Sequence, residues 1–186
     1  GDPASIPDLT YEDYLAFHKK YYHPSNSYLY LYGNMDMEEK LNWIDENYLS
    51  HFEKIEVDSE VRLQKPFAER KEEYGFYSVT EGEDTEGKAY FSYNTVCGDG
   101  LDRNLYRAFP VLSYVLVQSI GAPLKQALLD AGIGNDISCY YEESVRQPFF
   151  SIIAKNVKME QKQQFINVIE TELKKIVKEG LNQQSL

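Results

Sequence analysis

FFSIIAK, at residues 149–155, decides the expected fold, because its large apolar residues are typical of a largely buried strand. DISCYYE, at residues 136–142, precedes it and predicts a neighbouring strand. After the strand at residues 149–155, apolar residues recur at helical spacing and predict an amphipathic helix that ends near Gly180. The buried face of that helix is expected to hold Phe165, Ile166, Ile169, Leu173, Ile176 and Val177.

Two more helices are expected before these strands. Pro123 suits the first turn of a helix that runs to about Ala131 and leaves through Gly132. An earlier helix is expected from about Asp102, although Pro110 must kink or split it, at a cost of about 3 kcal/mol if it lies in the interior. The residues of this helix that are spaced for burial are Leu105, Phe109, Leu112 and Leu116.

Residues 74–80 and 89–97 are rich in Tyr, Phe, Val and Thr, which predicts a second pair of strands, and Gly98-Asp99-Gly100 ends this pattern. Strands and helices therefore alternate in pairs rather than as a strict βαβ series. This order predicts an α+β fold with a mostly antiparallel sheet backed by helices.

The first fifth of the chain is locally well formed. Thr10 and Asp13 make a capping box, and Pro24 stops the helix that follows. The apolar face of this helix is expected to hold Tyr11, Tyr14, Leu15, His18 and Tyr22.

Tyr28, Tyr30 and Tyr32 alternate with leucines, which predicts a half-buried strand over residues 28–32. Asp36 and Glu39 open a second helix that runs to about Tyr48, with Met37, Leu41, Ile44 and Tyr48 on one face. The charge-rich residues 50–70, with Pro66 among them, predict a connector between domains.

The order of features over residues 1–36 (GDPASIPDLTYEDYLAFHKKYYHPSNSYLYLYGNMD) resembles the insulinase or pitrilysin-type zinc metallopeptidases, the inverzincins. It looks like their presequence-protease and falcilysin branch, near the end of the first of four homologous domains. A sparser resemblance to the second domain continues through Pro123-Leu124-Lys125, Leu128-Leu129, Gly132-Ile133-Gly134 and Gln147-Pro148.

This resemblance implies a domain plan. Residues 1–49 are expected to be the C-terminal helix-strand-helix of the first, catalytic domain, and residues 50–70 a charged connector. Residues 71–186 are expected to be part of the second, non-catalytic domain, so the chain is expected to be a fragment cut at both ends. Because the domains of the family are homologous repeats, residues 28–32 could complete the sheet that contains residues 89–97 or 149–155.

The zinc site of the family is an inverted H-x-x-E-H motif on a helix, and no such motif occurs here. The three histidines are His18, His23 and His51. Five residues turn a helix through about 500°, so His18 and His23 cannot share one face. We therefore expect His18 to pack on the apolar helix face and His23 to lie at the helix end. No catalytic or metal-binding residue is expected in this chain, and its substrate-binding residues are unknown. The resemblance implies that the zinc site lies upstream, in the full-length parent.

Other candidate motifs favour structural readings. Cys97 and Cys139 lie in or at the ends of predicted strands, where buried, reduced thiols of a cytosolic or organellar protein are favoured over a disulfide. The spacing of residues 82–88 (GEDTEGK) matches a phosphate-binding loop, but three acids and Ala89 in place of Ser or Thr favour a solvated hairpin connection. Gly132-Ile133-Gly134 suits a helix C-cap that leads into a strand rather than a dinucleotide fingerprint.

Composition narrows the possible partners. The net charge of −11 argues against a nucleic-acid surface, and it fits either simple solubility or an acidic wall that faces basic peptides. No apolar run is long enough to span a bilayer, and no signal-peptide pattern occurs, so no membrane partner is expected. The expected location is the cytoplasm if the protein is bacterial, or a mitochondrion or plastid if it is eukaryotic.

The leading hypothesis from the resemblance is a non-catalytic scaffold and chamber-wall segment of a zinc-dependent oligopeptidase that hydrolyses short unfolded peptides. Its partners would be the remaining domains of the same parent chain and, in the parent, short peptides; the segment alone should be inactive. One alternative is a structural homologue that has lost zinc, such as a core-type subunit of a respiratory complex. Another is a peptide-binding module built on Tyr28, Tyr30 and Tyr32, which share a strand face.

Overall fold

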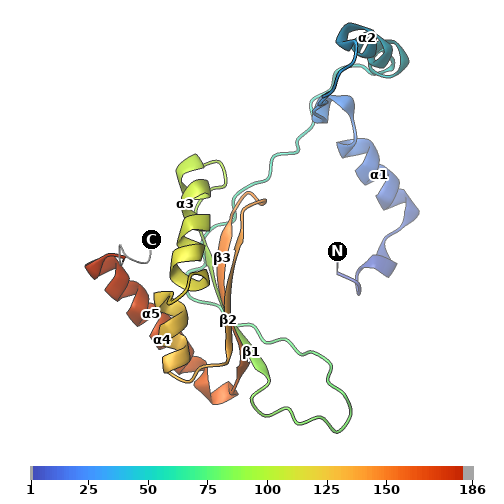
Figure 1. Ribbon diagram of the computed structural model, residues 1–186. Coiled ribbons are helices and arrows are strands. Elements are labelled where there is room, and N and C mark those ends of the chain that lie inside the picture. Colours follow the sequence, from blue (N-terminus) through green and yellow to red (C-terminus); the bar gives the residue numbers. More distant parts are fainter. Residues whose placement is uncertain (1, 182–186) are drawn as a thin grey trace. The chain divides into compact units, whose positions relative to one another are not determined.

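A computed structural model describes residues 2–181 of the chain (Figure 1). The chain divides into two units, Gly1–Arg62 and Leu63–Leu186, and each is described by itself. The assignment of these parts to a first and a second peptidase domain stays a prediction.

The second unit is built on an antiparallel sheet of three strands, β1 (Ala89–Val96), β2 (Asp136–Glu142) and β3 (Phe149–Val157), in the order β1-β3-β2. The FFSIIAK stretch therefore forms most of the central strand. Ala154 of β3 pairs with Phe91 on one side and with Ile137 on the other, which fixes the register of the three strands. The predicted α+β class with an antiparallel sheet is confirmed.

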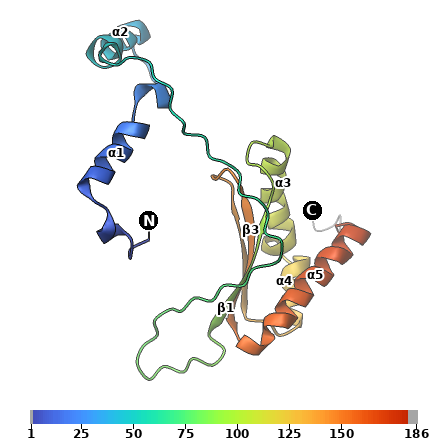
Figure 2. The ribbon, with the colours of Figure 1, turned by 180° about the vertical axis from the view of Figure 1, so that it is seen from behind.

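Helices cover one face of this sheet, as Figures 1 and 2 show. They are α3 (Arg103–Ser113), a π-helical turn η4 (Tyr114–Gln118), α4 (Pro123–Asp130), a short 3-10 turn η5 (Met159–Gln161) and α5 (Lys162–Glu179). The core between helices and sheet is apolar, and its buried members include Phe91, Val117, Leu124, Leu128, Ile133, Ile137, Ile152, Phe165 and Ile169.

Pro110 does not split its helix. The α3 helix passes through Pro110 and changes to π-helical geometry only after Ser113, where the Ser119 N–H bonds to the Tyr114 carbonyl over 2.8 Å. Within the π-helical turn, Val115, Leu116 and Val117 are all buried.

Two sequence predictions for this unit are wrong. Residues 74–80 are not a strand, because no other segment forms a hydrogen-bonded ladder with them, and the chain is irregular from Phe52 to Lys88. Val177 does not belong to the buried face of α5: its side chain is 87% exposed, whereas Leu173 and Ile176 of the same helix end pack against the core.

The first unit holds η1 (Ile6–Asp8), α1 (Tyr11–Tyr21), η2 (Pro24–Asn26), α2 (Met37–Asn47) and η3 (Leu49–His51). The predicted caps are confirmed: Thr10 Oγ1 accepts from the Asp13 N–H and Asp36 Oδ1 from the Glu39 N–H.

The predicted packing of the first unit is wrong, however. Residues 28–32 form no strand, so the proposed pairing of this segment with the sheet is not observed. No side chain among residues 2–62 is buried, and Tyr28, Tyr30 and Tyr32 are at least 84% exposed. The apolar helix faces exist in this unit, but the unit itself provides nothing that covers them.

Candidate functional site

The most connected polar feature of the second unit is the segment that precedes β1. Residues 64–79, which we call the strap, form no helix or strand, yet they are fastened at three points. At the first point, the side-chain amide of Gln147 forms two hydrogen bonds with the backbone of Gln64. Its Oε1 accepts from the Gln64 N–H over 2.7 Å, and its Nε2 donates to the Gln64 carbonyl over 3.1 Å. Such a pair of hydrogen bonds holds the backbone of Gln64 without involving the Gln64 side chain.

The other two points lie on α5. Arg70 Nη1 is 3.1 Å from Glu170 Oε1, and Lys162 Nζ donates to both Glu72 Oε2 and the Tyr74 hydroxyl over 2.7 Å. The hydrogen bond from Lys162, together with its charge, lowers the pKa of Glu72, and the same bond raises the pKa of Lys162. These ion pairs are partly exposed, so they position the strap more than they stabilise the fold.

Gln147 is itself held in a defined loop. Arg146, its neighbour, forms an ion pair with Asp99: Nη2 donates to Oδ2 over 3.0 Å, while Nε lies 3.0 Å from Oδ1 without hydrogen-bond geometry. The Gly100 N–H donates to the Arg146 carbonyl over 2.9 Å, and a Cβ at Gly100 would come within 2.9 Å of the Val145 carbonyl oxygen. The loop after β1 and the loop between β2 and β3 therefore need glycine at position 100, where they meet.

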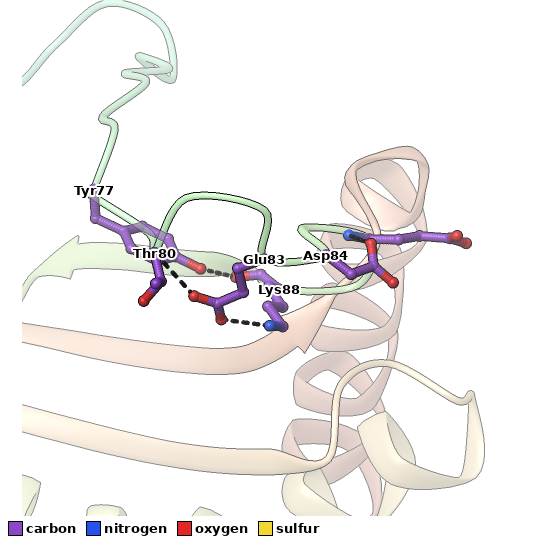
Figure 3. Close-up of polar contacts among 6 residues, drawn as sticks. Tyr77, Thr80, Glu83, Asp84 and Lys88 are labelled. Carbon is purple, nitrogen blue, oxygen red and sulfur yellow. Dashed lines mark hydrogen bonds and ion pairs between the residues drawn. The ribbon is translucent and has the colours of Figure 1, made fainter.

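The loop that resembles a phosphate-binding motif has a different arrangement (Figure 3). Lys88 makes an ion pair with Glu83, and Glu83 also accepts from the Thr80 N–H over 3.0 Å. The bond from Lys88 lowers the pKa of Glu83, and the bond to Glu83 raises the pKa of Lys88. Because the one lysine of the motif is paired and the chain continues into β1 rather than a helix, the loop is unsuited to a phosphate.

The histidines are structural in their contacts. His18 stacks on Tyr22, a member of the predicted apolar face, with ring centroids 4.6 Å apart, so it packs on that face as expected, although it is exposed. His23 caps η2, since its Nδ1 accepts from the Ser25 N–H over 3.1 Å. Over residues 2–181, no three His, Cys, Asp or Glu side chains are grouped so that they could hold a metal ion.

The cysteines lie where the sequence placed them. Cys97 directly follows β1 and is buried, Cys139 lies within β2 and is half-buried, and both are free thiols. Burial raises the pKa of both thiols, which makes them less reactive.

The Gly132-Ile133-Gly134 turn is a helix C-cap, as predicted. The N–H groups of Gly132 and Ile133 bond back to the carbonyls of Leu129 and Leu128 over 2.9 and 3.0 Å. Both glycines have positive φ, and Ile133 between them is fully buried.

The residues that attach the strap to the rest of the second unit were not predicted from the sequence. Gln64 and Arg70 were predicted only as members of the charged connector, and Glu72 lay between that connector and the strand predicted at residues 74–80. The partners of these three residues lie 83 to 100 residues further along the chain. The available signal was weak: polar side chains that alternate at positions 70, 72 and 74 fit a segment with one face against a helix.

Comparisons with known proteins identify a family and several relatives of this chain. A family model described as Peptidase M16 inactive domain matches residues 8–186. The chain is 47% identical over 184 residues to Protein HypA of Clostridium perfringens, an alignment that covers 99% of this chain and 19% of HypA. It is 31% identical over 190 residues to Presequence protease 1, chloroplastic/mitochondrial, of Arabidopsis thaliana, covering 100% of this chain and 18% of that protein.

The chain belongs to the peptidase M16 family as an inactive domain, and it is related to the presequence proteases. A second such relative, the mitochondrial presequence protease of Xenopus tropicalis, is 28% identical over 193 residues, which cover 100% of this chain and 18% of that protein. The chain thus spans about a fifth of the length of these relatives. None of the helices in residues 2–181 combines the length and apolar character needed to cross a membrane.

Proposed function

We propose that this chain is a non-catalytic scaffold and chamber-wall segment within a zinc-dependent oligopeptidase of the presequence-protease type. The observation that carries the proposal is the match to the inactive-domain model over residues 8–186, nearly the whole chain. In this proposal the zinc belongs to a site elsewhere in the longer protein, and short unfolded peptides are the substrates of that protein.

The exposed surface of the first unit supports a structural partner. Both of its helices are 11 residues long, and isolated helices of that length are marginal in water. Both helices carry exposed apolar side chains, and those of Tyr14 and Trp43 are more than half exposed. A surface of this kind is stable when another domain covers it, so the remaining domains of the same parent chain are the proposed partners.

The net charge of −11 supports an acidic wall that disfavours nucleic acid and suits basic peptides. For a bacterial parent the proposed location is the cytoplasm, and for a eukaryotic parent a mitochondrion or plastid. The proposal includes no membrane partner.

A peptidase assay tests this role. The purified chain is incubated with a set of short fluorogenic peptides, some basic and some neutral, beside an active zinc peptidase as positive control. We expect no hydrolysis above buffer by the chain, with and without added zinc. Zinc-dependent hydrolysis that a chelator removes would overturn the proposal.

The coding sequence of the longer protein separates this role from that of a structural homologue without zinc. An intact H-x-x-E-H motif upstream of the segment supports the peptidase parent. Loss of either histidine or the glutamate in that motif contradicts it.

A further inference from the structure

The outer face of α3 combines positive charge with apolar side chains. On the inner side of this helix, Phe109 stacks on Tyr141 of β2, and Leu112 packs against the core. The side chains on the opposite side recur at helical spacing, and all of them are exposed. We call them the outer stripe: Arg103, Arg107, Val111 and, at the start of η4, Tyr114.

The two arginines of the outer stripe have no carboxylate partner within residues 2–181, whereas the other arginines have one. Those are Arg62, Arg70 and Arg146. Asp102, next to Arg103, accepts instead from two backbone N–H groups of the first helical turn. Arg103 and Arg107 lie one turn apart at the positive end of the helix dipole, where like charges repel and an anion is favoured. This end of the stripe therefore suits an acidic partner.

The α2 helix of the first unit carries a complementary pattern. Glu38 and Asp45 border its apolar face at the two ends, and both are exposed. Glu39, on a different side of the helix, pairs with Lys40. The helices α2 and α3 are both 11 residues long, so the two faces match in length. The apolar face of α2, which nothing in the first unit buries, consists of Met37, Leu41, Ile44 and Tyr48.

We propose that α2 of a second copy of this chain packs antiparallel on the outer stripe of α3. In this register Asp45 lies between Arg103 and Arg107. The apolar residues of α2 then lie against Val111 and Tyr114, so that apolar side chains of both helices leave water. The antiparallel direction also opposes the two helix dipoles.

Two copies satisfy each other in this arrangement, with α2 of each chain on α3 of the other. This is the closed two-fold symmetry of most homodimers. The inference goes beyond the proposed scaffold role and does not depend on it, because the contact uses α2 and α3 and leaves the exposed face of α1 to the remaining domains of the longer protein.

The net charge of −11 makes two copies repel each other at long range. The association is therefore measured in about 0.15 M salt, where the screening length is about 8 Å. Such screening weakens the long-range repulsion more than it weakens charge pairs in direct contact.

Sedimentation equilibrium of the full 186-residue chain tests the contact. We expect an equilibrium between monomer and dimer. Arg107→Glu and Asp45→Lys should each raise the dissociation constant at least about tenfold, because each variant brings like charges together in the contact. Glu46→Lys is the matched control: it reverses a charge one position away, on the side of α2 that faces away from the stripe, and should change the dissociation constant by less than about twofold.

An equimolar mixture of the Arg107→Glu and Asp45→Lys chains identifies the two partners. In the mixture, α2 of the first variant meets the unchanged α3 of the second, and the two reversed charges meet each other in the other contact. Association should therefore return to the strength of the unmodified chain. The proposal is overturned by an unmodified chain that stays monomeric, by a mixture that associates as weakly as either variant alone, or by an equal loss with Glu46→Lys.

Discussion

Gly134 provides the sharpest test of the packing in the second unit. Its φ is +63°, and a Cβ there would lie 2.5 Å from the Lys155 carbonyl oxygen and 3.1 Å from Val157 Cγ1. Gly134→Ala therefore brings two penalties. A left-handed conformation costs an alanine about 1–2 kcal/mol. Forcing a methyl group against the backbone of the central strand adds about 1–3 kcal/mol.

Gly132 is the matched control for this substitution. Its φ is +68°, yet no heavy atom lies within 4 Å of its Cβ position, so Gly132→Ala brings only the conformational penalty. The free energy of unfolding of each variant is measured by urea denaturation, followed by far-UV circular dichroism. Gly134→Ala should be the less stable of the two by about 1–3 kcal/mol. Equal losses for the two variants would refute the close approach of this turn to β3.

Three further outcomes are expected. Leu128→Ala should lower the free energy of unfolding by about 2–5 kcal/mol because the Leu128 side chain is fully buried. Val177→Ala, at a position that is 87% exposed, should leave this free energy nearly unchanged. Similar losses for the two variants would contradict the assigned core. Lys88→Met should raise the pKa of Glu83 toward its ordinary value in a carboxyl NMR titration, and an unchanged pKa would exclude the ion pair. Cys97 should react with a thiol reagent far more slowly in the folded chain than in urea, so equal rates would contradict its burial.

The pH dependence of the Glu83 and Lys88 pair has a defined sign. The folded-state pKa of Glu83 is lowered, so the pair stabilises the fold above the unfolded pKa of a glutamate, and this contribution is lost as the pH falls through the folded value. Both side chains are more than a third exposed, so the effect on global stability is small.

Local sequence patterns predicted the elements that local physics determines. The bounds of β2, the caps at Thr10 and Asp36, and the glycine exit after α4 all follow from residues within a few positions of one another. The central strand was recognised from FFSIIAK because few other structures accept so many large apolar residues in succession.

The failures concern packing between distant parts of the chain. Residues 28–32 and 74–80 carry strand-like alternation, but a strand also needs an edge to pair with, and the sequence does not say which edge is available. Likewise, a periodic helix face predicts burial only where something covers it, and Val177, expected on the buried face of its helix, is exposed. The hydrogen bonds between Gln147 and Gln64 join residues 83 positions apart, so no local sequence pattern predicts them.

The zinc content of the purified chain tests the central claim most directly. The chain is expressed, incubated with excess zinc, dialysed, and analysed by inductively coupled plasma mass spectrometry beside a zinc peptidase of known stoichiometry. As an inactive domain of the peptidase M16 family, the chain should retain far less than one zinc ion per molecule. Retention of one tightly bound zinc ion per chain would contradict the non-catalytic assignment.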